Sequence, residues 1–308
     1  MGWSDGSSFV PILLSILSSA KEKNRLVPMR DDLYKRTNGY KRRQESISKS
    51  TDVLVDLVSL AMMAGIKARH LLFDSWFAFP GTIRKIRALG MHTVCMLKDM
   101  PRINDTLGER QVTLKALFKL LRKRPGRARV LASCLVTIGN DDNGIPVPAK
   151  VVFIRDRSSK NWLALLSTDT TLANEEIVKL YKRRWDIEVF FKIAKSFLQL
   201  AKECQSRSYD AMVAHATLVC CRYLILEIGK RTTADPRTLG TLFHATCDEI
   251  RQASFTEALA LLLKLLEQTL NAVVGYSKEQ VENLVRQFIE QLQPVFRGRL
   301  LLLPPTSV

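Results

Sequence analysis

The first third of the chain alternates short apolar runs with segments of helical periodicity. Residues 7–17, SSFVPILLSIL, form an apolar run with Pro11 near its start, which predicts a buried strand. Residues 20–49 are rich in Lys, Arg, Asn, Gly and Ser, so we predict an exposed loop. Apolar positions then recur at helical spacing from Ser50, and the pattern ends at Gly65, which predicts a helix.

A strand, a helix and a second strand follow in close succession. Residues 69–74, RHLLFD, form a short apolar run that ends in an acid, and residues 91–97, MHTVCML, form another. Between them, residues 79–90 carry a helical pattern that closes at Gly90. Strands that alternate with helices predict a mixed α/β sheet.

The pattern changes near residue 99. Three strand-like runs, VLASCLVTI, KVVFIRD and NWLALLST, flank the turn sequence GNDDNG and predict a small antiparallel β unit. Residues 174–200 return to a helical pattern, and the chain is almost wholly helical from residue 209 onward. The expected parts of the chain are therefore 1–98, 99–172, 173–228 and 229–308.

The charge of the chain narrows the choice of partner. Its 308 residues carry a formal net charge of +17. Residues 21–49 hold ten Lys or Arg against four acids, and residues 110–129 hold eight and no acid. Clustered positive charge of this size predicts a polyanionic partner, with nucleic acid favoured over a membrane surface.

The cysteines and the apolar runs are typical of a cytoplasmic protein. The six cysteines form no CxxC pair and no Cys/His ligand spacing, so the sequence favours neither a zinc site nor a disulfide framework. They are typical of reduced thiols in a cytoplasmic protein. The runs FVPILLSILSS and LALLLKLL are too short to span a bilayer, so we expect no membrane partner.

One predicted helix, YKRRWDIEVFFKIAK at residues 181–195, has two distinct faces. Tyr181, Arg184, Glu188 and Lys195 fall within about a quarter of the helical circumference. The residues expected to pack gather on another side and are Leu180, Ile187, Phe190, Ala194, Phe197 and Leu198. Charges four residues apart would also suit an ordinary surface helix with intrahelical ion pairs.

Two acids are candidates for chemistry. Asp74 lies at the end of a predicted buried strand, where side chains reach the rim of a sheet, and Glu188 lies on the charged helix face. Carboxylates that converge from separate elements can hold Mg²⁺, which takes one or two of them together with phosphate oxygens. A turn-forming role is the alternative for Asp74.

The four residues of the charged face have the spacing Tyr-x2-Arg-x3-Glu-x6-Lys. Together with the opening GWSDGSSFVPI and the segment LLFDSWF, this signature resembles the insertion-sequence-four branch of bacterial DDE transposases, over roughly residues 1–225. The resemblance implies an α/β, ribonuclease-H-like core that is interrupted by a β-rich insertion and followed by a helical C-terminal region.

Carried over residue by residue, the resemblance implies that Asp74 and Glu188 are catalytic and hold the metal. It implies a two-metal site for Mg²⁺, for which Mn²⁺ can substitute. Tyr181, Arg184 and Lys195 match the positions that hold transposon-end DNA.

Two tryptophans lie close to these residues in the sequence and could stack on displaced bases in DNA. We expect Trp76 to be a core aromatic. For Trp185, a DNA-binding role and a core position both stay open.

The start of the chain departs from the family pattern. The family's first catalytic aspartate lies on a strand upstream of the Gly-Trp-Ser/Thr-Asp-Gly segment, and this chain begins with that segment at Gly2. We therefore expect a transposase truncated at its N-terminus, without the first strand of its core. Asp5 is typical of a turn and is not at the matching position. The chain should then bind DNA without nicking it.

Three functions remain open. The resemblance implies an insertion-sequence transposase that cleaves and joins DNA as a homodimer in a synaptic complex. Its partners would be the terminal inverted repeats and target DNA, in the nucleoid of the cytoplasm. The first alternative is a truncated, non-catalytic DNA-binding remnant. The second is a helical interaction protein that dimerises through Leu-rich segments near residues 257–274 and 278–293, which leaves the four-residue signature unexplained.

Overall fold

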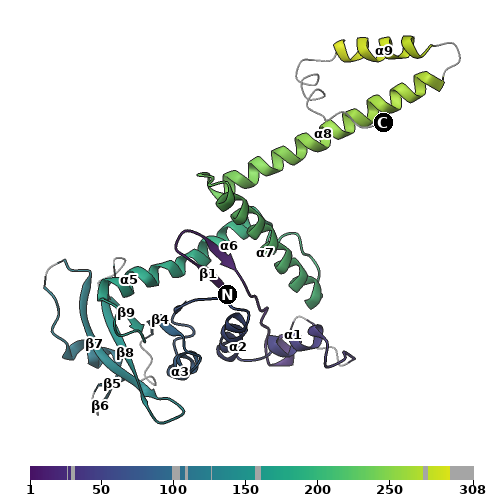
Figure 1. Ribbon diagram of the computed structural model, residues 1–308. Helices are drawn as coiled ribbons and strands as arrows, with labels where there is room; N and C mark the ends of the chain where they lie inside the picture. Colours follow the sequence, from purple (N-terminus) through teal and green to yellow (C-terminus); the bar gives the residue numbers. More distant parts are fainter. Residues whose placement is uncertain are drawn as a thin grey trace. The chain divides into compact units, whose positions relative to one another are not determined.

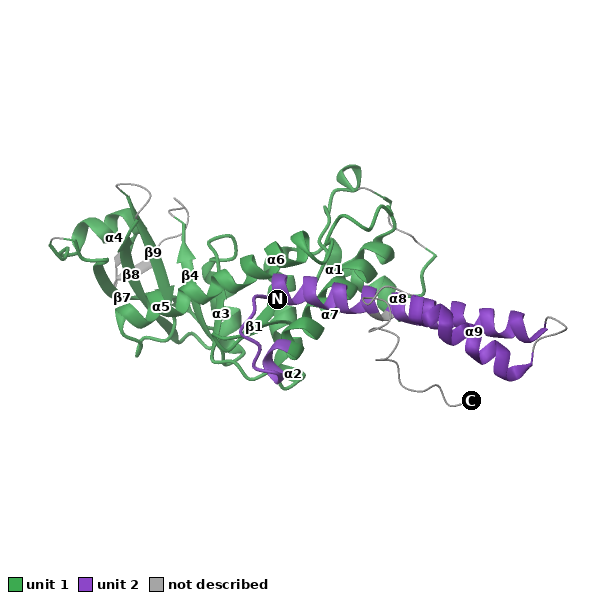
Figure 2. Cartoon of the chain, turned by 90° about the horizontal axis from the view of Figure 1, so that it is seen from above, with its two compact units in different colours: residues 1–229 green, residues 230–308 purple. Residues whose placement is uncertain are grey.

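The computed structural model describes most of the chain, in two compact units. Unit 1 spans residues 1–229 and unit 2 spans residues 230–308, coloured green and purple in Figure 2. The described residues are 1–25, 27–28, 32–98, 105–107, 110–125, 127–156, 161–272 and 277–291. The expected start of the β-rich insertion at residue 99 lies outside them.

Unit 1 mixes strands and helices (Figure 1). Its described strands are β1 (Gly2–Ser4), β2 (Phe9–Pro11), β3 (His70–Phe73), β4 (His92–Leu97), β5 (Asp105–Leu107), β6 (Arg110–Val112), β7 (Val130–Asn140), β8 (Pro146–Arg155) and β9 (Trp162–Ser167). Its described helices are the 3-10 helix η1 (Glu22–Asn24), α1 (Asn38–Ser46), α2 (Ser50–Met63), α3 (Pro80–Ala88), α4 (Leu114–Leu120), α5 (Asn174–Lys182), the 3-10 helix η2 (Arg183–Trp185), α6 (Asp186–Ser196) and α7 (Tyr209–Thr232), whose last three residues belong to unit 2.

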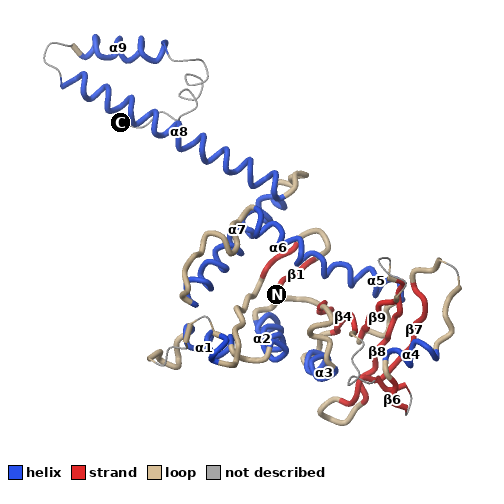
Figure 3. The backbone as a smooth tube through the Cα atoms, turned by 180° about the vertical axis from the view of Figure 1, so that it is seen from behind, coloured by secondary structure: helices blue, strands red, loops and turns tan. Residues whose placement is uncertain are grey.

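Seven described strands form one sheet in the order β3-β4-β9-β8-β7-β5-β6, drawn in red in Figure 3. β3 runs parallel to β4, and the other neighbouring strands of the sheet run antiparallel to each other. The three antiparallel strands that the sequence predicted are confirmed. They also continue the sheet of β3 and β4 through β9, which the pattern did not indicate. β1 and β2 form a separate antiparallel hairpin.

The sheet is buried on both faces. Successive side chains of a strand point to opposite faces, so neighbours on β8 enter different clusters. Phe153 packs in an apolar cluster with residues of α2, α3 and α4, whereas Val152 packs in a second cluster with Ile177 of α5. Helices therefore cover the two faces of a mixed α/β sheet, an arrangement consistent with a DDE transposase fold.

Periodicity predicted most elements of the first hundred residues. The helix that begins at Ser50, the helix that closes before Gly90 and both predicted strands are present. Two predictions were wrong. The strand expected over residues 7–17 covers only Phe9–Pro11, and the loop expected over residues 20–49 contains α1.

A long-range ion pair explains why local sequence did not reveal α1. The Arg43 guanidinium, 9% exposed, donates two hydrogen bonds of 2.8 and 2.7 Å to the Asp210 carboxylate of α7. It also lies 5.3 Å from the ring centroid of Tyr209. Thr37 caps the helix, since its hydroxyl accepts from the Tyr40 amide. The charged segment is helical because a distant helix supplies its partner.

A buried carboxylate ties the start of β3 to the end of β9. The Asp169 side chain is 2% exposed and lies 3.0 Å from His70 Nε2 and 3.0 Å from Arg69 Nη2. Burial opposes its ionisation, but hydrogen bonds from Thr171 and His70 lower the pKa of Asp169 to about 2. Asp169 is therefore an ionised link that fixes this end of β3.

Unit 2 is helical among its described residues, as predicted. It contains α8 (Leu239–Ala272) and α9 (Lys278–Gln291), which contact each other. Several large apolar side chains of these two helices are exposed, and they include Leu261, Leu262, Leu265 and Phe288.

One described helix, α7, has the length and apolar composition that a membrane-crossing helix needs. A single helix of this kind is weak evidence, because core helices pass the same test. Its sequence also carries Arg222, which pairs with Glu203 at 3.0 Å, and the buried Glu227.

Adjacent phenylalanines on α6 provide a matched test of how this helix is held. Phe190 is 6% exposed, and its ring centroid lies 5.6 Å from that of Phe9 and 4.9 Å from that of Tyr223. We expect Phe190→Ala to lower the free energy of unfolding by about 3–5 kcal/mol, because it leaves a cavity between α6, β2 and α7. Phe191→Ala, at a 41% exposed position, should change it by less than about 1 kcal/mol. Urea titration measures both, and equal losses would contradict the packing.

The low pKa of Asp169 predicts a pH dependence of stability. An unfolded aspartate has a pKa of about 3.9, so a folded value of about 2 stabilises the fold above pH ~4. This contribution is lost as the pH falls from about 4 towards 2, because the carboxylate becomes protonated. In urea titrations between pH 7 and 3, Asp169→Asn should flatten the decline, whereas Asp142→Asn, at an exposed turn, should keep the wild-type slope. Parallel curves for wild type and Asp169→Asn would refute this role.

Candidate active site

The signature residues lie on α5, η2 and α6. The backbone stays in the right-handed helical region through the junctions at Arg183 and Asp186, so the three segments run on as one helical stretch. The predicted packing face is confirmed, since Phe190, Ala194 and Leu198 are buried. The opposite side is left to carry the charged residues.

Asp74 directly follows β3, at the end of the strand opposite to Asp169. Its Oδ1 accepts a 2.8 Å hydrogen bond from the Trp76 amide, so one carboxylate oxygen helps to form the turn. The side chain is only partly covered. Asp74 thus has the turn role that the sequence allowed and still faces a cavity.

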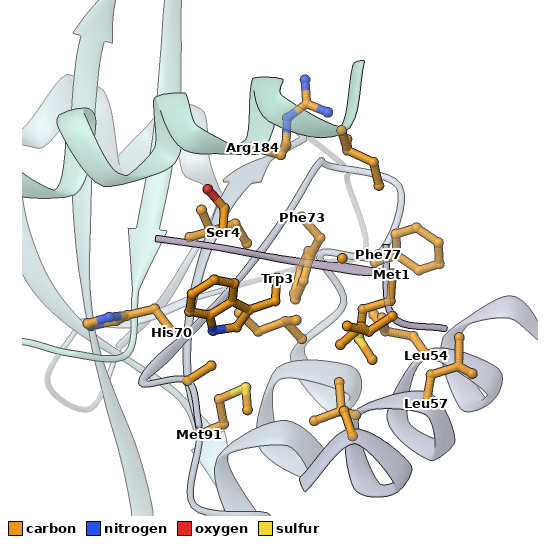
Figure 4. Close-up of a pocket in the computed structure, with 18 of the residues that line it drawn as sticks. Met1, Trp3, Ser4, Leu54, Leu57, His70, Phe73, Phe77, Met91 and Arg184 are labelled. Atoms are coloured by element: carbon orange, nitrogen blue, oxygen red, sulfur yellow. The ribbon is translucent and has the colours of Figure 1, made fainter. Parts of the chain in front are cut away.

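That cavity contains both candidate acids. Its volume is about 680 Å³, and Asp74, Arg184 and Glu188 all line it. Most of the other lining residues are apolar and come from the β1–β2 hairpin, α2 and β3, as Trp3, Leu54 and Phe73 show in Figure 4. The structure therefore brings the two acids of the prediction to the wall of one cavity from separate elements.

Arg184 organises the charged side of this wall. Its guanidinium, 20% exposed, lies 3.2 Å from Glu188 Oε1 and 5.9 Å from the Tyr181 ring centroid. Burial raises the pKa of Tyr181, and the charge of Asp74 adds to this shift, while Arg184 opposes it. Tyr181 is thus protonated at neutral pH, like an ordinary tyrosine, and can donate a hydrogen bond.

Asp74 and Glu188 are the two carboxylates that line this cavity. No group of three metal-ligating side chains occurs among the residues that the structure describes. Asp5 forms a turn, because its Oδ1 accepts from the amides of Ser7 and Ser8. Asp186 accepts a 2.7 Å hydrogen bond from the Ser4 hydroxyl and so joins β1 to α6. Asp74 and Glu188 alone fit the demand of Mg²⁺ for one or two carboxylates supplemented by phosphate oxygens.

The remaining predicted residues lie at the surface. Lys195 is exposed about two helical turns beyond Glu188. Trp185 is 63% exposed, which decides against a core position. Trp76 is 64% exposed, so the expectation of a core aromatic was wrong; Lys98 Nζ lies 6.0 Å from its ring centroid. Trp76 lies in the turn after β3, where the alternation of buried and exposed positions along a strand no longer decides which way a side chain points.

Two further cations were missed by the sequence. Arg183 lines the cavity, and its guanidinium group lies directly against Gly6 in the turn of the hairpin. Gly6 also has a φ of +92°, which glycine adopts without strain. Arg69 lines the cavity as well. Arg183 could have been found from the sequence, because it lies in the basic run Lys182-Arg183-Arg184 next to the signature residue Arg184.

The comparison with known families agrees with the position of these residues. The family described as "Transposase DDE domain" matches residues 45–225, which include Asp74, Tyr181, Arg184, Glu188 and Lys195. No curated protein sequence matches the chain.

The shared cavity can be tested by cross-linking. In a variant with the exposed Cys221 replaced by serine, Asp74→Cys and Glu188→Cys should be joined by a short bifunctional thiol reagent. A two-metal site, with its cations about 4 Å apart, requires this proximity. Mass spectrometry of tryptic peptides identifies the product. The pair Asp74→Cys and Asp142→Cys is the control, and equal yields from the two pairs would contradict the arrangement.

Proposed function

The chain belongs to the transposase DDE domain family, and from this premise we propose a transposase of the insertion-sequence-four branch with a ribonuclease-H-like core. It would bind the ends of its element and catalyse divalent-metal-dependent cleavage and joining of DNA strands. The observation that carries the proposal is the cavity that Asp74, Arg184 and Glu188 line together, inside the matched region.

Asp74 and Glu188 would hold the divalent cation. When bound, Mg²⁺ or Mn²⁺ would activate a water and stabilise the leaving 3′ oxygen of a phosphodiester. The Arg184 guanidinium lies 3.2 Å from Glu188 Oε1 in the structure. When DNA binds, a phosphate oxygen would replace Glu188 as the partner of Arg184. The carboxylate would then be free for a metal.

Three neighbouring side chains would place the DNA backbone. Arg184 offers a planar fork for two phosphate oxygens, and Lys195 offers a point charge further along α6. Tyr181, whose pKa is raised further by burial, would donate a hydrogen bond from its hydroxyl group to a phosphate oxygen. The exposed Trp185 would stack on an unpaired base near the cut.

The charge of the whole chain supports DNA as the partner. The net charge of +17 includes the exposed cations of the segment after α4, among them Arg122, Arg127 and Arg129. Transposase activity on two element ends further suggests a homodimer that pairs the terminal inverted repeats and then meets target DNA in the nucleoid.

A non-catalytic, DNA-binding remnant is the second candidate. Its support is the absence of a third metal-ligating side chain near Asp74 and Glu188 within the described part of the chain. This candidate predicts DNA binding without any metal-dependent nicking, so the two functions are separable in one assay on a labelled duplex.

Electrostatic binding predicts a salt dependence. Each neutralised phosphate contributes a log-log slope of about −0.9, so affinity for duplex DNA should fall steeply with salt. The triple variant Arg122→Gln, Arg127→Gln, Arg129→Gln should make the slope less negative by up to about 2.7, if each cation meets one phosphate. Fluorescence anisotropy at several salt concentrations gives the slope.

The matched control removes the same charge from unit 2, with Lys264, Lys278 and Arg286 changed to Gln. These cations lie outside both basic clusters, so we expect a smaller change of slope. Equal effects of the two triple variants, or a flat wild-type dependence, would refute specific binding through the segment after α4.

Localised radical cleavage tests the metal site itself. Fe²⁺ enters carboxylate sites built for Mg²⁺, and with peroxide and ascorbate it cuts the nearby backbone. With duplex DNA present, we expect cuts near residues 74 and 188, which mass spectrometry can locate. Asp74→Asn together with Glu188→Gln should abolish both cuts, and Asp142→Asn should keep them. Cuts that persist in the double variant would remove these acids from the metal site, and nicking of the duplex should require the same acids.

A further inference from the structure

Two parallel strands end at the edge of the sheet that carries Asp74. β3 runs parallel to β4, with Phe73 paired to Cys95, so the residues that follow the two strands come out at the same edge. Asp74 follows β3 directly, and Lys98 follows β4 directly. In open α/β sheets, ligands bind at the carboxyl ends of the strands. Lys98 is therefore at the edge where the proposed function places DNA.

The side chains of β4 indicate the face of the sheet to which Lys98 belongs. Met96 packs in the apolar cluster that also includes Tyr181, whereas Leu97 packs in the cluster on the other face. Successive residues of a strand point to opposite faces, so Lys98 is the next position on the face of Tyr181. That face is the one covered by α5, which leads into the signature residues.

A direct contact locates the Lys98 ammonium. Its Nζ lies 6.0 Å from the ring centroid of Trp76. The Trp76 amide in turn donates a 2.8 Å hydrogen bond to Asp74 Oδ1. Asp74 and Trp76 are two positions apart, so their backbones are separated by at most about 7 Å. The ammonium therefore lies beside the turn that presents Asp74.

The charge of Lys98 is not neutralised within the described structure. Its side chain is exposed, and no described acid forms an ion pair with it. The ring beneath it belongs to Trp76, which is 64% exposed. Attraction to an indole face holds a cation in place but leaves its charge and its hydrogen-bond donors available to another partner. An exposed ammonium that is held in this way fits an anion.

We propose that Lys98 is a further binding residue of this site, which holds a backbone phosphate of the DNA strand close to the phosphate held by Arg184, and that Trp76 positions its ammonium. The inference rests on the proposed function, because it concerns the DNA that the site would bind. It adds a residue that lies outside the Tyr-Arg-Glu-Lys signature and comes from a different element of the fold.

The two cations approach Asp74 from different elements, which predicts the spacing of their phosphates. Arg184 comes from η2, and both it and Asp74 are close to Tyr181, because their charges shift the pKa of this tyrosine in opposite directions. Lys98 comes from the end of β4. Successive phosphates of one strand advance by about 3.4 Å along a duplex, so the two cations should meet phosphates within about three positions of each other.

Neutral phosphate analogues test this arrangement without any need for activity. Labelled duplexes carry the terminal repeat from the DNA that flanks the gene, each with one methylphosphonate in place of one phosphate. Anisotropy titrations compare wild type, Lys98→Gln and Arg184→Gln on every duplex. At the phosphate that Lys98 holds, we expect the variant and the methylphosphonate each to weaken binding by about threefold to tenfold, and both together by no more than either alone.

Matched variants separate the parts of the proposal. Lys85 is the control, since it is exposed on α3, which covers the other face of the sheet, and its Nζ lies 2.9 Å from Asp52. Lys85→Gln should show no coupling with any phosphate, and Lys98→Arg should keep the wild-type position. Trp76→Leu should reduce the coupling at the Lys98 phosphate by about twofold or more, and Trp76→Phe, which keeps a ring, should restore most of it. Circular dichroism shows whether each variant is folded.

The outcomes distinguish this inference from the proposed function. A phosphate that depends on Arg184, without one that depends on Lys98 within about three positions, would overturn this inference alone. Equal effects of Lys98→Gln and Lys85→Gln would reduce Lys98 to a contribution to net charge and would also overturn it. Equal effects of Trp76→Leu and Trp76→Phe would remove the positioning role of Trp76. If no phosphate depended on Arg184, the proposed function would fail, and this inference with it.

Discussion

The free edge of β3 is the constraint on which the site depends. Asp74 reaches the cavity because β3 has a described strand partner on one side only. A strand bonded to β3 on its other side would occupy the space that Glu188 now borders from α6. The packing of Phe190 against β2 and α7 then fixes the position of α6 relative to this edge. One edge and one aromatic contact thereby decide that the two carboxylates share a wall.

The two ends of β3 differ in rigidity. At its start, His70 and Arg69 are held by the ionised, buried Asp169, which the low pKa keeps charged across the physiological range. At its end, Asp74 is held through a single oxygen by the Trp76 amide. Its second oxygen has no described protein donor, so that oxygen is the one available to a cation. Fixing one end of a short strand orients the acid at the other without burying it.

Periodicity predicted the helices and strands whose partners are close in sequence. The helix that begins at Ser50, the strands β3 and β4 and the antiparallel run β7 to β9 are of this kind. The helix α1 was missed because Arg43 finds Asp210 at a distance of 167 positions, and no local window contains that pair. The charged face of α6 was visible because residues four apart must meet on a helix. Its convergence with Asp74 was accessible only through the family signature, since spacing within one helix says nothing about a separate strand.

An unpaired strand edge is also a hazard, because it can template pairing between copies of a protein. Three features limit that hazard here. β3 is only four residues long, Lys67 and Arg69 precede it, and the Trp3 indole spans the opening to the Lys67 carbonyl. A second copy would have to bring a strand past this indole and these cations. The same features therefore limit self-association at the strand edge that positions Asp74.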